Sequence, residues 1–212
     1  MSFGMFLNFE KESIEIIEEH ISKMTDDNTI YYDVSERYIL EEEAFIENLK
    51  NGSTAIVFIQ NLFETSLNTI LRRRAEISEI DILKSSIGIK LQVISLIYNF
   101  DLSEIKSNNL YSMYREVEKI RNDITHFKSN ILCHASAIPA DVKIDLGTSK
   151  KSLATIFTQT YIKNCYLQIL SLIELICSKC DLFINKDVLI LDCDGRDVSC
   201  EFIVDKKPIK YD

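Results

Sequence analysis

Three residues in one short stretch, Arg121, Asn122 and His126, have side chains whose types and spacing suit acid–base chemistry on a phosphate group. A histidine titrates near neutral pH and therefore gives or takes a proton under physiological conditions. An arginine carries a permanent charge and a forked set of donors that matches phosphate oxygens. On an exposed helix face such residues are commonly only solvated side chains, so the spacing by itself leaves both interpretations open.

The segment that carries these residues has the pattern of an amphipathic helix, which we expect from about Ser107, as N-cap, to Ser129. Its apolar residues fall on one stripe at helical spacing: Leu110, Met113, Val117, Ile120, Ile124, Phe127 and Ile131. Arg121 lies at the edge of this stripe, whereas Asn122 and His126 share a face nearly opposite its centre. If the stripe packs into the chain's own bundle, His126 points outward, to solvent or to a second subunit.

The composition favours an all-α domain that positions this helix. The chain has 212 residues, of which 46% are hydrophobic, but only 5 glycines and 2 prolines. Turn-rich β-sandwiches and low-complexity linkers need far more of both residues. The formal net charge of −9 disfavours a DNA-coating or membrane-surface role, because the chain lacks a broad positive field.

Neither a secretory signal nor a membrane span is expected, so we predict a cytoplasmic protein. The N-terminal apolar run has no positive residue before it, and the most apolar stretch, Ser152–Cys177, is interrupted by polar residues. Six cysteines occupy positions 133, 165, 177, 180, 193 and 200 and are expected to be reduced thiols. Cys177 and Cys180 have redox-motif spacing, but they fall late in a helical pattern rather than at a helix start. We therefore predict neither a metal site nor a cofactor.

Hydrophobic periodicity divides the rest of the chain into helices followed by a hairpin. Helices are predicted at about 8–24, 35–50, 54–74, 80–99, 107–129 and 151–183, with an irregular segment at 130–150. Asn51-Gly52-Ser53 predicts a helix stop, and one long helix with a kink at Gly52 is the alternative. The tail alternates around Asp-Gly, which predicts a β-hairpin formed by 188–191 and 198–204. We therefore expect a helical bundle over residues 1–185 and a hairpin appendage over 186–212.

Arg121-Asn122-Asp123-Ile124-Thr125-His126 resembles the Arg-(four to six residues)-His motif of the HEPN superfamily, in which a polar residue usually follows the arginine. The motif stands late in a small helical bundle, as in that family. Phe63-Glu64 resembles the Phe-Glu pair found in an earlier helix of many such domains. The resemblance covers about residues 8–183 in helix order and implies a HEPN-like bundle.

The resemblance further implies a metal-independent endoribonuclease, usually a homodimer, of the toxin–antitoxin or antiviral defence type. In such families the two motifs meet across a twofold axis in a shared cleft. The implied substrate is RNA, with Arg121, Asn122 and His126 as catalytic residues and an antitoxin or activator protein as a partner. In family members silenced by modification, a tyrosine stands two residues after the histidine. Here that position is Lys128, which either contacts phosphate instead or is simply solvated.

Other assignments stay open on the sequence alone. Glu64 lines the cleft and orients Arg121 or His126, or else is an ordinary half-buried carboxylate. Arg72-Arg73-Arg74 either grips RNA or answers the dipole at a helix C-terminus, and we prefer the second interpretation. His20 reads as a packed or half-exposed histidine without a catalytic role. A non-catalytic HEPN-like module that binds RNA, nucleotide or a partner protein remains the alternative function.

Overall fold

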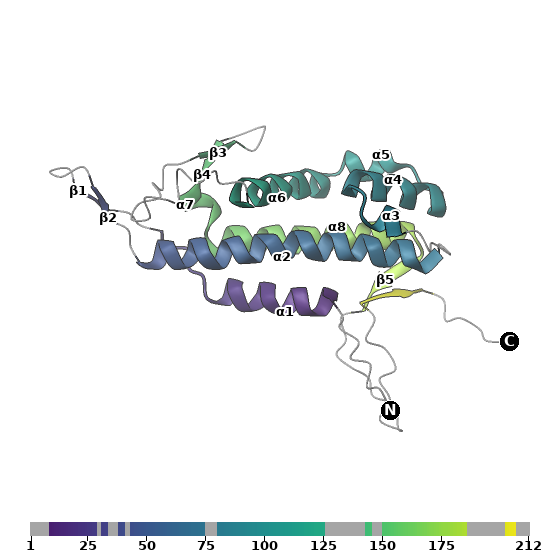
Figure 1. Ribbon diagram of the computed structural model, residues 1–212, viewed down its shortest axis with the longest axis horizontal. Helices are drawn as coiled ribbons and strands as arrows, with labels where there is room; N and C mark the ends of the chain where they lie inside the picture. The colour runs from purple at the N-terminus through teal and green to yellow at the C-terminus, as the bar shows by residue number, and fades with distance from the viewer. Residues whose placement is uncertain are drawn as a thin grey trace, which may run out of the picture. The chain divides into compact units, whose positions relative to one another are not determined.

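The computed structural model describes residues 9–28, 31–33, 38–40, 43–74, 80–125, 143–145, 150–185 and 202–206 (Figure 1). These residues are mostly helical, which confirms the predicted class. The chain divides into two compact units. The first comprises Met1–Ser13, Asn61–Tyr111 and Leu170–Asp212, and the second comprises Ile14–Gln60 and Ser112–Ile169. Helices α1 (Phe9–Ser22), α2 (Glu43–Arg74), α6 (Asn109–Thr125) and α8 (Gln159–Lys179) each contribute residues to both units.

Helix α2 runs unbroken through the predicted stop at Gly52 (Figure 1). Gly52 is buried, and a Cβ atom on it would lie 2.6 Å from the Cδ1 of Phe157 and 3.0 Å from the Cε of Met24. Because Gly52 has no side chain, it leaves room for Phe157 and Met24, and it does not end the helix. Asn51 is buried as well, and its Nδ2 donates to the carbonyl of Glu47 at 2.9 Å, within the helix.

The predicted helix at 35–50 is wrong over its first part. Residues 38–40 form strand β2 (Tyr38–Leu40), which pairs antiparallel with β1 (Tyr31–Asp33). The aromatic and β-branched residues of these two strands favour extended structure. The predicted irregular segment likewise contains a strand, β3 (Lys143–Asp145), paired antiparallel with β4 (Lys150–Ser152).

One predicted helix is broken, and the next begins slightly later than predicted. The segment 80–99 forms α3 (Ile80–Leu83) and α4 (Ile87–Tyr98), with Ser86 extended between them. A short α5 (Leu102–Lys106) follows, and the Asp101 carboxylate caps it by accepting from the Ser103 amide at 2.8 Å. Ser107, the expected N-cap of the next helix, ends α5 instead, and the Asn108 side chain caps α6 through the Leu110 amide at 2.9 Å.

The predicted helix at 151–183 is divided and ends early. Helix α7 (Leu153–Ile156) precedes α8, whose first turn is capped by Asp26 through the amide and hydroxyl of Thr160 at 2.8 and 2.6 Å. Asp181 has a left-handed φ of 56°, which stops the helical course. Strand β5 (Leu182–Ile184) then pairs antiparallel with β6 (Ile203–Asp205).

An antiparallel strand pair near the C-terminus is therefore confirmed, but with β5 as the first strand. The expected strand at 188–191 lies outside the described residues. Each unit is built around fully buried apolar side chains from several helices. The first unit buries Leu62, Leu67, Ile70, Leu91, Ile94 and Ile176, and the second buries Ile17, Phe45, Ile56, Val117, Ile120 and Ile162.

Candidate active site on helix α6

Helix α6 presents its apolar stripe to the core much as its periodicity predicts. Val117 and Ile120 are fully buried, and Met113 and Ile124 are half-buried. Tyr114 is buried beside them and packs in the core. Its hydroxyl donates to Glu118 Oε1 at 2.7 Å, one turn along the helix. The core-facing side of the helix is thus set by aliphatic packing.

Arg121 and Asn122 are both half-buried at the last described turn of α6. The Nη1 of Arg121 donates to the Oδ1 of Asn122, with 3.1 Å between the two atoms. The Thr125 hydroxyl donates to the carbonyl of Arg121 at 3.0 Å. Among the described residues, the guanidinium is therefore held by a neutral amide.

This neutral partner distinguishes Arg121 from neighbouring cations. Arg115, one and a half turns earlier on α6, pairs with Glu118 at 2.5 Å. Lys151 pairs with Glu116 at 3.2 Å. No carboxylate within the described part of the chain forms an ion pair with Arg121.

A polar cluster that the sequence did not reveal fixes the middle of α6. The Tyr161 hydroxyl of α8 donates to Glu116 Oε2 at 3.1 Å, and Lys151 donates to the same oxygen at 3.2 Å. The Lys151 ammonium also lies 4.8 Å from the centroid of the Tyr161 ring. Burial, followed by the nearby Cys165 and Glu116 charges, raises the pKa of Tyr161, so its proton stays in place as a donor.

The histidine of the motif is not among the residues that the structure describes. Helix α6 is described as far as Thr125, so His126 and Lys128 fall outside the described residues. The contact between Arg121 and Asn122 is accordingly the part of the predicted site that the structure brings together.

Glu64 belongs to the first compact unit, whereas Arg121 and Asn122 belong to the second. Its Oε1 accepts from the Nζ of Lys90 at 2.6 Å. The Lys90 side chain is fully buried, whereas that of Glu64 is 41% exposed. Because a buried ammonium needs a compensating charge, this contact gives Glu64 a structural task.

The arginines at the end of α2 are engaged in structural contacts. The Nη2 of Arg73 donates to the carbonyl of Ile203 at 2.6 Å, and its guanidinium lies 3.5 Å from the Asp205 carboxylate. Arg74 stacks over the ring of Tyr98, 5.3 Å from its centroid. These contacts attach strand β6 and helix α4 to the end of α2. They favour the structural interpretation of the cluster.

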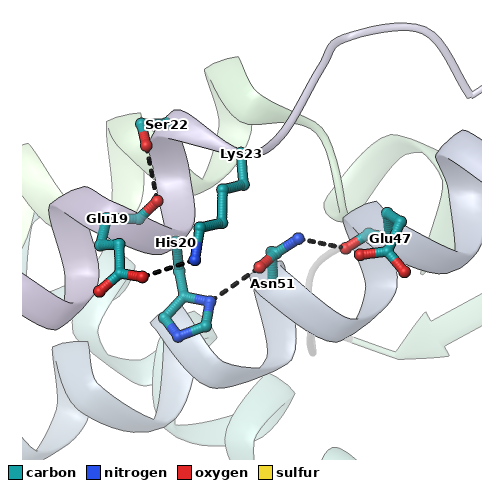
Figure 2. Close-up of polar contacts among 6 residues, drawn as sticks. All are labelled: Glu19, His20, Ser22, Lys23, Glu47 and Asn51. Atoms are coloured by element: carbon teal, nitrogen blue, oxygen red, sulfur yellow. Dashed lines mark hydrogen bonds and ion pairs between the residues drawn. The ribbon is translucent and has the colours of Figure 1, made fainter.

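His20 of α1 contacts Asn51 of α2, and Figure 2 shows the two side chains facing each other. The distance between His20 Nδ1 and Asn51 Oδ1 is 2.8 Å. The Asn51 amide nitrogen is already donating to Glu47, so its oxygen faces the imidazole and Nδ1 carries the proton. This contact accounts for His20 as a packing histidine that joins two helices.

The cysteine pair of the redox-type spacing is buried. Cys177, Cys180 and the more distant Cys165 are all buried free thiols. Burial raises the pKa of each to about 12, which keeps them protonated at neutral pH. Among the described residues, no group of three or more His, Cys, Asp or Glu side chains is arranged to hold a metal ion. None of the described helices has the length and apolar character needed to cross a membrane.

The chain was also compared with known proteins. No protein-family model matches it, and searches of curated proteins and of solved structures return no match.

Proposed function

We propose that this protein is a metal-independent endoribonuclease in which Arg121, Asn122 and His126 cleave RNA through attack of its 2′-hydroxyl. The proposal rests on the resemblance of this motif to that of HEPN ribonucleases. The observation that supports it best is the state of Arg121. This guanidinium is half-buried and bonded to the neutral Asn122 amide rather than to a described carboxylate.

The chemistry requires two proton transfers and one centre of positive charge. A base takes the proton of the 2′-hydroxyl, whose oxygen attacks the adjacent phosphorus. An acid then gives a proton to the departing 5′ oxygen, which leaves a 2′,3′-cyclic phosphate and a 5′-hydroxyl. His126 suits either transfer because imidazole titrates near neutral pH. A homodimer would supply one histidine for each step.

Arg121 would stabilise the transition state rather than move protons. Negative charge builds up on the non-bridging oxygens as the phosphorane forms, and a fixed guanidinium next to them lowers its free energy. Asn122 bonds to the guanidinium at 3.1 Å and restricts its rotation before RNA binds. The arginine side chain then loses less conformational freedom on binding. In this role Asn122 is a positioning residue, and its amide nitrogen remains available to the phosphate or imidazole.

The proposed partners follow from this function. The substrate is RNA, and the expected biological role is that of a toxin or defence effector controlled by an antitoxin or activator. DNA is not a substrate, because it lacks the 2′-hydroxyl that serves as the nucleophile. No metal ion takes part in either proton transfer.

The experiment is a cleavage assay in excess EDTA with purified wild-type protein and the His126→Ala variant. Total tRNA, a long single-stranded RNA and a DNA strand of the same sequence serve as substrates, and the product ends are mapped. The proposal predicts RNA cleavage with cyclic phosphate ends, intact DNA, and a rate reduced at least about 100-fold by His126→Ala.

Two results would contradict the proposal. One is cleavage that persists in the His126→Ala variant, which would place the activity elsewhere. The other is the absence of cleavage together with RNA binding that His126→Ala leaves unchanged, which would favour a non-catalytic binding module. Circular dichroism and thermal unfolding of both proteins serve as the folding control.

A further inference from the structure

Helix α4 is apolar on two opposite sides. One side packs into the first unit through Ile87, Leu91 and Ile94, which are buried. On the other side Ile89 is 50% exposed, Leu96 is 73% exposed and Ile97 is 37% exposed. A helix that is hydrophobic all round is normally covered on all sides.

The exposed residues form one continuous face with helical spacing. Ile89, the half-buried Val93, Leu96 and Ile97 stand at positions i, i+4, i+7 and i+8. Gly88 and Gln92 border them and are also exposed. We call these six residues the α4 face. Isolated exposed apolar residues are normal, but such a stripe on one helix is typical of a helix-binding surface.

The α4 face carries no charge, although the chain as a whole has a formal net charge of −9. The one charged residue of α4, Lys90, points the other way: its side chain is fully buried and bonded to Glu64. Charges stand only at the two ends. Lys84 is exposed just before α4, and Asp101 is exposed just after it.

We propose that the α4 face is a self-association surface, on which α4 of a second copy of this chain packs antiparallel. A twofold interface brings the same patch of both copies together, so the patch must be complementary to itself. A pairing centred between Gln92 and Val93 meets this condition. It places Ile89 opposite Leu96 of the second copy, and Lys84 opposite Asp101 of the second copy.

The same register fits the sizes of the remaining side chains. Gly88 then faces Ile97 of the second copy, and a Cβ atom at Gly88 would meet only Ser86 Oγ, at 4.0 Å, within its own chain. The smallest residue of the face thus leaves room for a large one. The antiparallel arrangement also sets the N-terminal end of each helix dipole next to the C-terminal end of the other.

The charge distribution of the chain favours a second copy, rather than a different protein, as the partner of the α4 face. An acidic chain recruits a basic partner through acidic side chains, and the α4 face has none. Two copies of net charge −9 repel each other, so they associate most easily through a face without charge. A standard interface buries about 800 Å² on each partner, and one pair of helices buries less than this. We therefore expect a dissociation constant on the order of micromolar.

This inference concerns self-association alone and does not rest on the proposed function, and its test does not involve RNA cleavage. Sedimentation equilibrium of the full chain without RNA, over a roughly hundredfold concentration range around micromolar, gives the dissociation constant. We expect Leu96→Glu to raise this constant about 30-fold or more, because it places a charge in the apolar contact, opposite Ile89 of the second copy. Ile89→Ser is a milder variant with the same expected direction.

The matched control is Leu167→Glu, since Leu167 is 49% exposed on a different helix, α8; it should leave the constant unchanged within about twofold. Lys84→Glu tests the register: it should weaken association about tenfold at low salt, and added salt should restore it. A wild-type monomer over the whole range, or equal association of wild type and Leu96→Glu, would overturn the proposal. Equal association of wild type and Lys84→Glu would overturn the antiparallel register.

Discussion

The ammonium of Lys90, fully buried on α4, lies 2.6 Å from the Oε1 of Glu64 on α2. A buried ammonium needs a compensating charge, and this carboxylate supplies it. The contact joins two helices of the first unit and assigns Glu64 a task that its sequence position did not reveal. Whether Glu64 also contacts RNA can be tested by substitutions in this pair.

Glu64→Gln should lower the free energy of unfolding by about 1–3 kcal/mol, which is less than for a fully buried pair because Glu64 is 41% exposed. Adding Lys90→Met removes the uncompensated charge and should restore most of the loss. Urea denaturation measures both effects. If the double variant also cleaves RNA like wild type, Glu64 acts through stability alone. A double variant that regains stability but not cleavage would show that Glu64 takes part in the reaction.

Gly52→Ala should destabilise the protein by about 1–3 kcal/mol, because the added methyl group would lie 2.6 Å from Phe157. Helix propensity alone predicts the opposite sign, a gain of about 1 kcal/mol. Gly88→Ala is the matched control, because its Cβ would meet only Ser86 Oγ, at 4.0 Å, an ordinary contact. This substitution should stabilise the protein by about 0.5–1 kcal/mol. Thermal unfolding at low concentration measures both variants. Stabilisation by Gly52→Ala would contradict the close packing around this glycine.

Cys165, Cys177 and Cys180 should resist alkylation in the native protein. Burial raises the pKa of each thiol to about 12, so at pH 8 the reactive thiolate is scarce. Iodoacetamide labelling followed by peptide mass mapping should show these three positions unmodified until denaturant is added. Rapid labelling of Cys177 or Cys180 in the folded state would instead support a redox role for the pair.

Tyr98 should make stability depend on alkaline pH. Burial, more than the nearby charges, raises its pKa to about 12, against about 10 in the unfolded chain. The unfolded state therefore loses the proton first, and the contribution of Tyr98 is present below pH 10 and is lost as pH rises from about 10 to about 12.

The Tyr98→Phe variant checks this dependence. It removes the hydrogen bond from the Tyr98 hydroxyl to the Ile70 carbonyl, 3.2 Å long, and should cost about 1 kcal/mol at neutral pH. Because the phenylalanine does not titrate, the stability difference between variant and wild type should narrow and then reverse as pH rises from about 10 to about 12. A constant difference over this range would show that burial does not raise the pKa of Tyr98.

The sequence predicted those elements whose pattern is local. Helices α1 and α6 follow the spacing of their apolar residues, and the burial of Val117 and Ile120 agrees with the predicted stripe. A helix stop was predicted at Gly52, and this was wrong. In sequence, a glycine that leaves room for the Phe157 side chain cannot be distinguished from a glycine that ends a helix. The difference between the two lies in a residue about a hundred positions away.

The candidate site was predicted in the same uneven way. Helical spacing is enough to place Arg121 and Asn122 at the same turn, but not to show that their side chains bond to each other. The pairs formed by Glu64 with Lys90 and by Glu116 with Lys151 depend on which helices pack together. No periodicity within a single helix carries that information.

The most direct test of the proposed ribonuclease compares two arginines of α6 that differ in their partners. Arg121 bonds to the neutral Asn122, whereas Arg115 is 61% exposed and pairs with Glu118. The measurement is the rate of RNA cleavage in EDTA by Arg121→Ala and Arg115→Ala. The account predicts a loss of about 100-fold or more for Arg121→Ala, and a change of less than about threefold for Arg115→Ala. Equal rates for the two variants would contradict the assignment of Arg121 to the site.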